Sequence, residues 1–174
     1  MVISELKDQP FEHISIDIAG PYRYSGTNSS ITYSVIIQDN LSKYIRFTPL
    51  QDTTGETVME TILKYWISYF GAPVEILSDN APNLTASRLQ KFCNKLGINT
   101  ISSRSYHPQT NRAVERSHAG LAKYLGTTMD ELKEDMDWET RLSLACLCYN
   151  QIIHSMNYYL VLSLTYLKFH IPGT

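Results

Sequence analysis

Three carboxylates occupy positions in the sequence where a carboxylate is unexpected unless it has a chemical role. Asp17 lies inside the alternating run His13-Ile14-Ser15-Ile16-Asp17-Ile18, and Asp79 follows a short apolar run. Glu115 comes later, and residues 80–114, 35 in all, separate it from Asp79. Mg²⁺ takes oxygen ligands and is commonly held by one or two carboxylates. Two such ions about 3.5 to 4 Å apart can activate a nucleophile and stabilise a leaving oxygen at a phosphodiester. The three acids therefore predict a two-metal site.

Each acid also has an ordinary structural explanation. Asp79 alone is typical of a turn residue, and Glu115 alone of a helix-surface charge that pairs with Arg112 or Lys123. Asp17 is harder to explain in this way, because Asp is disfavoured in strands. Solvated surface charge explains the acidic run Glu131, Glu134, Asp135 and Asp137.

Other reaction chemistries lack their sequence patterns. The chain has no Gly-x-Ser-x-Gly elbow for a serine nucleophile. Its five histidines have neither paired cysteines nor regular spacing, which argues against zinc. The odd cysteine count favours reduced thiols in an intracellular protein over a disulfide framework: Cys93, Cys146 and Cys148.

The segments around Asp17 predict an antiparallel start to a sheet. Phe11 to Ala19 alternates with period two, so Asp17 faces away from the isoleucine row. Gly20-Pro21 and the polar stretch to Ser30 predict a turn. Two further β-rich segments follow, and three antiparallel strands are the simplest interpretation: Ile31 to Gln38 and Tyr44 to Leu50.

The middle of the chain predicts two crossovers that place Asp79. Thr53-Thr54-Gly55-Glu56 matches a capping box, and a helix behind it ends at Gly71 and Pro73. The apolar segment Val74 to Leu77 predicts a buried strand. Asp79 is then expected at the carboxyl end of this strand, where open α/β sheets bind ligands. A second helix and a strand over Ile98 to Ile101 make the sheet partly parallel. That helix is capped by Thr85, stops at Gly97 and faces inward with Leu89, Phe92, Cys93 and Leu96.

Two later helices complete the predicted elements. Pro108 can occupy an early helical position, and the helix that follows carries Glu115. A last amphipathic helix starts near Asp137, and its apolar stripe comprises Trp138, Leu142, Ala145, Tyr149 and Ile152. The apolar tail from Tyr158 to Phe169 is either a short helix or a strand.

The composition limits the classes of protein to which the chain can belong. An apolar fraction of 43% and a charged fraction of 18% are those of a globular protein, and 174 residues fit one domain over 1–174. A net charge of −2 and a pI near 6.2 do not describe a strongly basic nucleic-acid binder, so any contact with DNA must be local. Neither a signal peptide nor a membrane-spanning stretch is evident, and we expect a nuclear or cytoplasmic protein.

In order and spacing the chain resembles the catalytic core of retroviral and gypsy-type retrotransposon integrases, which carry an Asp, Asp, 35-residue gap, Glu triad. The resemblance covers nearly the whole chain. It rests on the three acids and on five matched segments: Pro10 to Asp17 with Gly20-Pro21, Asp39-Asn40-Leu41-Ser42-Lys43-Tyr44, Tyr69-Phe70-Gly71-Ala72-Pro73, His107-Pro108-Gln109-Thr110-Asn111 and Val114-Glu115-Arg116.

The resemblance implies an α/β, ribonuclease-H-like fold with a five-stranded mixed sheet flanked by helices, and a homodimer. Asp17 would bridge two Mg²⁺ or Mn²⁺ ions, while Asp79 and Glu115 would each complete one ion's shell. The implied reactions are 3′-end processing of element DNA and transfer of those ends into target DNA. Residues implied to contact DNA are His107, Gln109, Asn111, Arg112, Arg116 and Lys123.

Departures from the family pattern leave a second function open. Ala81 and Arg112 stand where the family usually has Gly, which stiffens the loop before the catalytic helix. Arg112 can pair with Glu115 and compete with a metal ion, or it can meet a DNA phosphate. The family's zinc-binding amino-terminal domain and basic carboxyl-terminal domain are not found in the chain, so we expect a fragment or a gene reduced to the core. The alternative is a non-catalytic, element-derived module for dimerisation or for nucleic-acid or protein binding.

Overall fold

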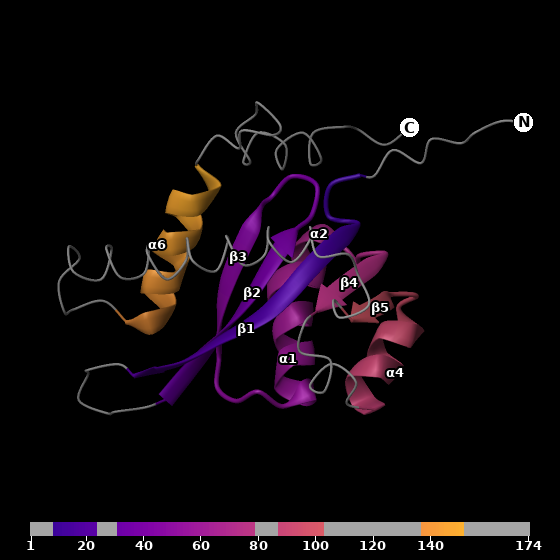
Figure 1. Cartoon of the computed structure of the whole chain (residues 1–174), viewed down its shortest axis with the longest axis horizontal. Helices are drawn as coiled ribbons and strands as arrows, with labels where there is room; N and C mark the ends of the chain where they lie inside the picture. The colour runs from indigo at the N-terminus through magenta and orange to yellow at the C-terminus, as the bar shows by residue number, and fades with distance from the viewer. Residues whose placement is uncertain (1–8, 24–30, 79–86, 103–136, 152–174) are drawn as a thin grey trace, which may run out of the picture.

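Five strands form one mixed sheet in the order β3-β2-β1-β4-β5 (Figure 1). β1 pairs antiparallel with β2, and β2 with β3, while β4 runs parallel to both β1 and β5. The predicted antiparallel start and partly parallel sheet are therefore confirmed. The strands are β1 His13–Arg23, β2 Ile31–Asp39, β3 Ile45–Leu50, β4 Glu75–Ser78 and β5 Asn99–Ser102.

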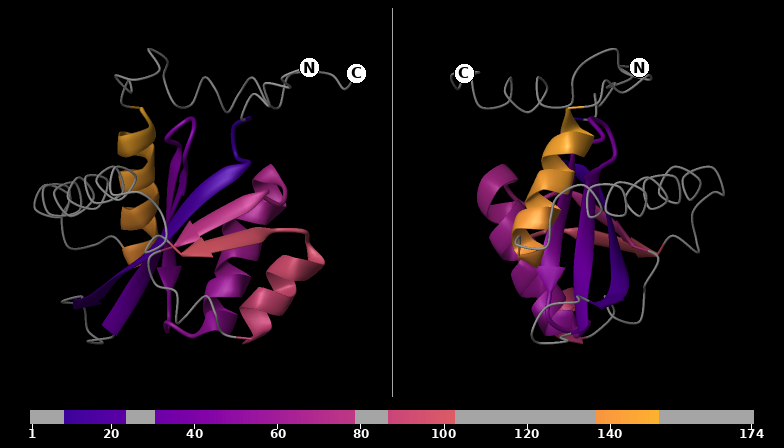
Figure 2. Two further views of the ribbon diagram at one scale, coloured as in Figure 1. Left: turned by 45° about the vertical axis from the view of Figure 1, so that its right-hand side comes forward. Right: turned by 90° about the vertical axis from the view of Figure 1, so that its left-hand side faces the viewer.

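The structure is a computed structural model that describes residues 9–23, 31–78, 87–102 and 137–151. Helix α4 lies beside the β5 side of the sheet and α6 beside the β3 side (Figure 2). None of the helices in these ranges is long and apolar enough to cross a membrane. The predicted helix that carries Glu115 and the apolar tail lie outside the described residues. The helical segments are α1 Gly55–Ile62, the π-helical η1 Leu63–Ile67, α2 Ser68–Phe70, α4 Ser87–Lys95 and α6 Trp138–Asn150.

Strand alternation divides the apolar side chains between two cores. Ile14 and Ile16 of β1 face the larger core, which also contains Trp66 from η1 and Cys93 from α4. The opposite face carries Ile36 of β2, and a smaller core forms there against α6. Successive strand residues point to opposite faces, so the period-two pattern of β1 accounts for both layers.

The helix after β3 begins one residue later than predicted. The Thr54 side chain accepts a hydrogen bond from the Thr57 N–H at 3.4 Å, so Thr54 is the N-cap and the box from Thr53 to Glu56 is wrong by one position. Asp52 contributes to this choice, because its carboxylate accepts bonds from the Thr54 N–H and hydroxyl. Helical structure continues through η1 and α2 and ends, as predicted, at Gly71 with φ of +86°.

Helix α4 buries Cys93 and partly buries Phe92, as predicted. Leu96 was expected to face inward but is 42% exposed, because the helix ends at Lys95 and Leu96 lies in the turn that Gly97 completes with φ of +70°. The predicted cap Thr85 and the side chain of Leu89 lie outside the described residues.

The predicted turn at Gly20-Pro21 is wrong, because β1 continues to Arg23. The Gly20-Pro21 peptide bond is cis, and the pairing with β2 shifts between Ala19 and Tyr22. Ala19 pairs with Ser34 and Tyr22 with Thr32, so β1 holds one more residue than β2 over this stretch. Such an irregularity is a β-bulge, and it reverses the side-chain parity of the strand beyond it.

The outer edge of β3 is covered by side chains of α6. Asn150 accepts a hydrogen bond from the Ile45 N–H at 2.9 Å and donates one to the Ile45 carbonyl at 2.8 Å. Two residues along β3, the Phe47 N–H donates to Cys146 Sγ at 2.9 Å. Two residues further, Pro49 has no N–H to offer. We call this set of contacts the edge clasp, and it satisfies the backbone groups that an edge strand otherwise leaves open.

Candidate active site

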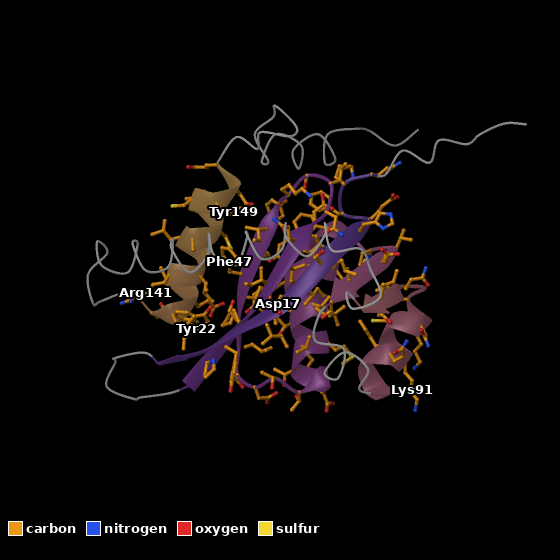
Figure 3. All side chains as sticks on the ribbon, viewed as in Figure 1. Asp17, Tyr22, Phe47, Lys91, Arg141 and Tyr149 are labelled. Carbon is orange, nitrogen blue, oxygen red and sulfur yellow. The ribbon has the colours of Figure 1, made fainter. Side chains whose placement is uncertain are left out.

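Asp17 lies in the middle of β1, the central strand of the sheet. It pairs with Ile36 of β2 and, by strand alternation, is on the face opposite Ile16. That face belongs to the smaller core and α6, and Asp17 is half-buried there (Figure 3). The predicted orientation of Asp17 away from the isoleucine row is thus confirmed.

The backbone fixes the Asp17 carboxylate. Its Oδ1 accepts a hydrogen bond from the Ile18 N–H at 2.7 Å. Such a bond to a charged acceptor is among the stronger hydrogen bonds and limits rotation of the side chain. Asp17 therefore presents an oriented oxygen donor from a rigid strand.

The next parallel strand ends directly beside Asp17. In the β1–β4 register Ile16 pairs with Ser78, the last residue of β4. Asp79 follows Ser78 in the sequence but lies outside the described residues, as do Ala81 and Glu115. The structure thus locates one of the three predicted carboxylates and the strand end that precedes the second. Also outside the described residues are the predicted DNA contacts His107, Gln109, Asn111, Arg112, Arg116 and Lys123.

Tyr22 and Trp138 lie on the same side of the sheet as Asp17, and the sequence reasoning missed both. The bulge at Gly20-Pro21 returns Tyr22 to the face of Ala19 and Asp17, and its ring lies 5.0 Å from that of Trp138 at the start of α6. Burial raises the pKa of the Tyr22 hydroxyl, and the negative charge of Asp17 raises it further. A Gly-Pro pair inside a strand pattern was the available signal for the bulge.

A second conspicuous acid, Asp39, is structural. It is fully buried at the end of β2, where its carboxylate accepts bonds from the Phe11 N–H at 2.9 Å and the Ser42 N–H at 2.7 Å. Burial lowers the pKa of the nearby Lys43, an effect that the charge of Asp39 partly opposes. Asp39 thus anchors the β2–β3 turn and the loop before β1, at the end of β1 away from Tyr22.

The donor chemistry at Asp17 suits a hard cation. A carboxylate oxygen is the ligand type that Mg²⁺ and Mn²⁺ prefer. Within the ranges that the structure describes, no group of three His, Cys, Asp or Glu side chains gathers. The other two predicted ligands, Asp79 and Glu115, lie outside those ranges. The three cysteines are free thiols, as predicted, and Cys146 and Cys148 both lie in α6.

A separate hollow of about 250 Å³ lies at the β3 edge, between η1 and α6. Arg46 lies on its wall and stacks over the rings of Tyr69 at 4.7 Å and Tyr65 at 5.9 Å. The Tyr65 hydroxyl donates a hydrogen bond to Glu139 at 3.2 Å, which joins η1 to α6 across the opening. Asp17 is not among the lining residues, so this hollow is distinct from the candidate metal site.

The mixed five-stranded sheet, with a carboxylate on its central strand and a parallel strand that ends beside it, defines a ribonuclease-H-like fold of the integrase core type. Solved structures share it. The fold is similar to a chain of the simian T-cell lymphotropic virus intasome, with a TM-score of 0.78, 21% identity, and coverage of 94% of this chain and 56% of that one. It is also similar to the HTLV-2 integrase catalytic core domain in complex with magnesium, with a TM-score of 0.73, 18% identity, and coverage of 90% and 97%.

The chain belongs to the integrase core domain family, which residues 7–108 match. This range contains Asp17 and Asp79 and ends before Glu115. Similar curated proteins include the Pol polyprotein from transposon 412 of Drosophila melanogaster, 28% identical over 150 residues, which are 86% of this chain and 12% of that protein. The transposon Tf2-3 polyprotein of Schizosaccharomyces pombe is 29% identical over 150 residues, or 85% of this chain and 11% of that protein. The chain thus spans about an eighth of the length of these relatives.

Proposed function

We propose that this chain is an integrase core that cuts and joins phosphodiester bonds of DNA during DNA integration, by 3′-end processing and strand transfer. The observation that carries the proposal is the oriented Asp17 on the central strand, with the end of β4 beside it. Family membership supports the same reaction class. We further propose a nuclear or cytoplasmic location, which microscopy of a tagged chain would test.

Asp17, Asp79 and Glu115 would hold two Mg²⁺ or Mn²⁺ ions. When bound, such ions polarise the phosphodiester and lower the pKa of the attacking water or hydroxyl. Asp17 contributes a carboxylate whose direction is set by the Ile18 N–H. Asp79 directly follows Ser78, the residue of β4 that pairs with Ile16 next to Asp17. Tyr22 and Trp138 would form an apolar wall on the α6 side and limit the access of bulk water.

A disintegration assay on branched DNA tests the catalytic proposal. We expect strand joining by the wild type with Mn²⁺ or Mg²⁺, and a loss of more than about a hundredfold in Asp17→Asn, because loss even of a residue that only supports a metal ligand costs 10- to 100-fold. Tyr33→Phe is the control, because it is a conservative change at a side chain that packs against the larger core, on the sheet face opposite Asp17. Equal activity in the wild type and Asp17→Asn would refute the proposal.

Substitution of Arg112 distinguishes the catalytic function from its alternative, a non-catalytic module for dimerisation or for nucleic-acid or protein binding. Arg112 is three residues before Glu115 and could compete with a metal ion for that carboxylate. Activity that is gained only in Arg112→Gly would identify Arg112 as an inactivating substitution in this chain. Activity in the wild type that Arg112→Gly lowers would favour a DNA phosphate contact instead.

Metal binding can be measured without catalysis. At an ion concentration ten times Kd, binding stabilises the fold by about 1.4 kcal/mol, which corresponds to a rise in Tm of roughly 3 to 6 °C. We expect Mg²⁺ or Mn²⁺ to produce this rise, and Asp17→Asn or Asp79→Asn to remove it. No response in the wild type at millimolar ion would contradict the metal assignment.

We also propose that the chain forms a homodimer through the surface around the β3-edge hollow. Two large apolar side chains are exposed at this hollow: Leu147 of α6, which lines it, at 48%, and Tyr69 of α2, which contacts the lining residue Arg46, at 55%. The solved HTLV-2 integrase core is described in dimeric and trimeric forms. Burial of these side chains against a second copy would remove them from water.

Sedimentation of two matched variants tests this surface. Leu147→Glu should shift the protein to the monomer, because a charge would be buried in the interface. Leu96→Glu makes the same change at a residue of similar exposure on the far side of the sheet, and should leave the dimer intact. A monomeric wild type, or equal dissociation by both variants, would rule out this dimer surface.

A further inference from the structure

The net charge of −2 conceals a strong separation of charge along the chain. Residues 80–114, between the second and third predicted ligands, contain no Asp or Glu and five Lys or Arg. The rest of the chain holds ten Lys or Arg against all 17 Asp and Glu. The net charge of residues 80–114 is therefore +5, and that of the rest of the chain is −7. The five basic residues are Arg88, Lys91, Lys95, Arg104 and Arg112.

Helix α4 is the described helix of this basic interval, and its two faces differ completely. One face packs Phe92 and Cys93 against the larger core. The opposite face exposes Lys91, Asn94 and Lys95, which recur at the i, i+3 and i+4 spacing of one helix surface. Figure 3 shows Lys91 on the outer side of α4, at the opposite side of the molecule from α6. We call these three residues the α4 basic face.

Other described cations are engaged by the protein itself. Lys43 Nζ donates to the Asn40 carbonyl at 2.6 Å, Lys64 lies 4.9 Å over the Tyr65 ring, and Arg46 stacks on tyrosines at the β3 edge. Over the ranges that the structure describes, neither Lys91 nor Lys95 has an ion pair or a ring contact. No carboxylate in α4 offsets their charge. Both ammonium groups are therefore available to an external anion.

We propose that the α4 basic face binds the phosphate backbone of duplex DNA that flanks the reactive phosphodiester. Lys91 and Lys95 lie four residues apart, a rise of about 6 Å along the helix, so both can contact phosphates of one DNA segment. The Asn94 amide between them can donate a hydrogen bond to a phosphate oxygen, which is a common partner of Asn side chains. The inference rests on the proposed function only in taking DNA as the ligand.

The position of α4 indicates which part of the DNA it contacts. Cys93 packs α4 on the sheet face opposite that of Asp17, and the helix lies at the β5 side. Lys91 and Asp17 are well separated in Figure 3. The α4 basic face therefore binds DNA that flanks the reactive phosphodiester. Its loss should raise KM for DNA and leave kcat unchanged.

The salt dependence of DNA binding by the full chain tests the proposal. Each phosphate contact contributes about −0.9 to the slope of log K against log salt. The double variant Lys91→Gln, Lys95→Gln should therefore flatten the slope by about 1.8. Between 50 and 200 mM salt, its affinity should fall about twelvefold less than that of the wild type. Fluorescence anisotropy with two duplexes of unrelated sequence should give the same change for both, since phosphate contacts carry no sequence information.

Two control variants distinguish the effect of charge at these two positions from the effect of losing a charge anywhere on the surface. Lys91→Arg with Lys95→Arg keeps both charges and should retain the wild-type slope. Lys64→Gln removes one exposed charge elsewhere and should leave the slope unchanged, whereas Lys91→Gln alone should reduce it by about 0.9. An unchanged slope in the double glutamine variant, or an equal effect of Lys64→Gln, would overturn the proposal.

Failure of this inference is distinguishable from failure of the proposed function. Asp17→Asn should abolish strand joining but keep the wild-type salt slope for DNA. The double glutamine variant should keep strand joining at saturating DNA. A protein that shows the predicted slopes but no joining would sustain the α4 basic face while the catalytic proposal fails.

Discussion

The edge clasp yields a stability prediction whose size follows from the structure. Asn150 is 3% exposed, and its side chain makes two hydrogen bonds with the backbone of Ile45, which is itself fully buried. Asn150→Ala removes both bonds and leaves a buried N–H and a buried carbonyl without partners. Each orphaned group costs about 1 to 3 kcal/mol. We expect a total loss of about 2 to 6 kcal/mol in the free energy of unfolding.

Urea unfolding followed by circular dichroism measures this loss directly, and thermal melting should show a fall in Tm of roughly 4 to 24 °C. Gln151→Ala is the matched control, because it removes an exposed amide at the next position and should change stability by less than about 0.5 kcal/mol. A loss below that threshold in Asn150→Ala would show that Asn150 does not hold the β3 edge.

Further predictions concern a buried acid, a buried thiol and a turn. Asp39→Asn should cost about 1 to 3 kcal/mol in urea unfolding, because an amide has one oxygen to accept the two N–H bonds of Phe11 and Ser42. Burial raises the pKa of the Cys146 thiol from 9.0 to about 11, so its stabilising contribution is complete below pH 9 and is lost as pH rises through 11. Urea titrations at pH 9 and 11 should therefore show roughly 2 kcal/mol more loss in the wild type than in Cys146→Ala. Gly71→Ala should lower the free energy of unfolding by about 1 to 3 kcal/mol, since φ of +86° with ψ of 173° strains any side chain; thermal melts would measure it.

Local patterns predicted the parts of the fold that depend on short-range physics. The isoleucine alternation in β1 was enough to predict a strand and the outward direction of Asp17, because strand parity is a property of adjacent residues. The prediction from strand alternation failed beyond Gly20-Pro21, where the bulge shifts the register. For this reason Tyr22, which the structure places on the Asp17 face, was not predicted to lie there.

Contacts between distant segments could not be read from the sequence. Asn150 meets Ile45 across 105 residues, and no local pattern marks an asparagine near a helix end as the cover of an edge strand. The candidate site, too, was only partly predictable from local sequence. Asp17 was predictable from its conflict with a strand pattern, and the structure positions it. Asp79 and Glu115 lie outside the described residues, so their place in the site stays a prediction.

The edge clasp also limits how the sheet can grow. A sheet normally has two open edges, and a protein with two can add strands from other molecules at both ends and extend into a fibril. Here Asn150, Cys146 and Pro49 block one edge, while β5 has no strand partner on its outer side within the described residues. Edge-to-edge pairing of folded chains through β5 would therefore join two molecules and then stop. A change that opened the β3 edge would turn a terminating contact into a propagating one.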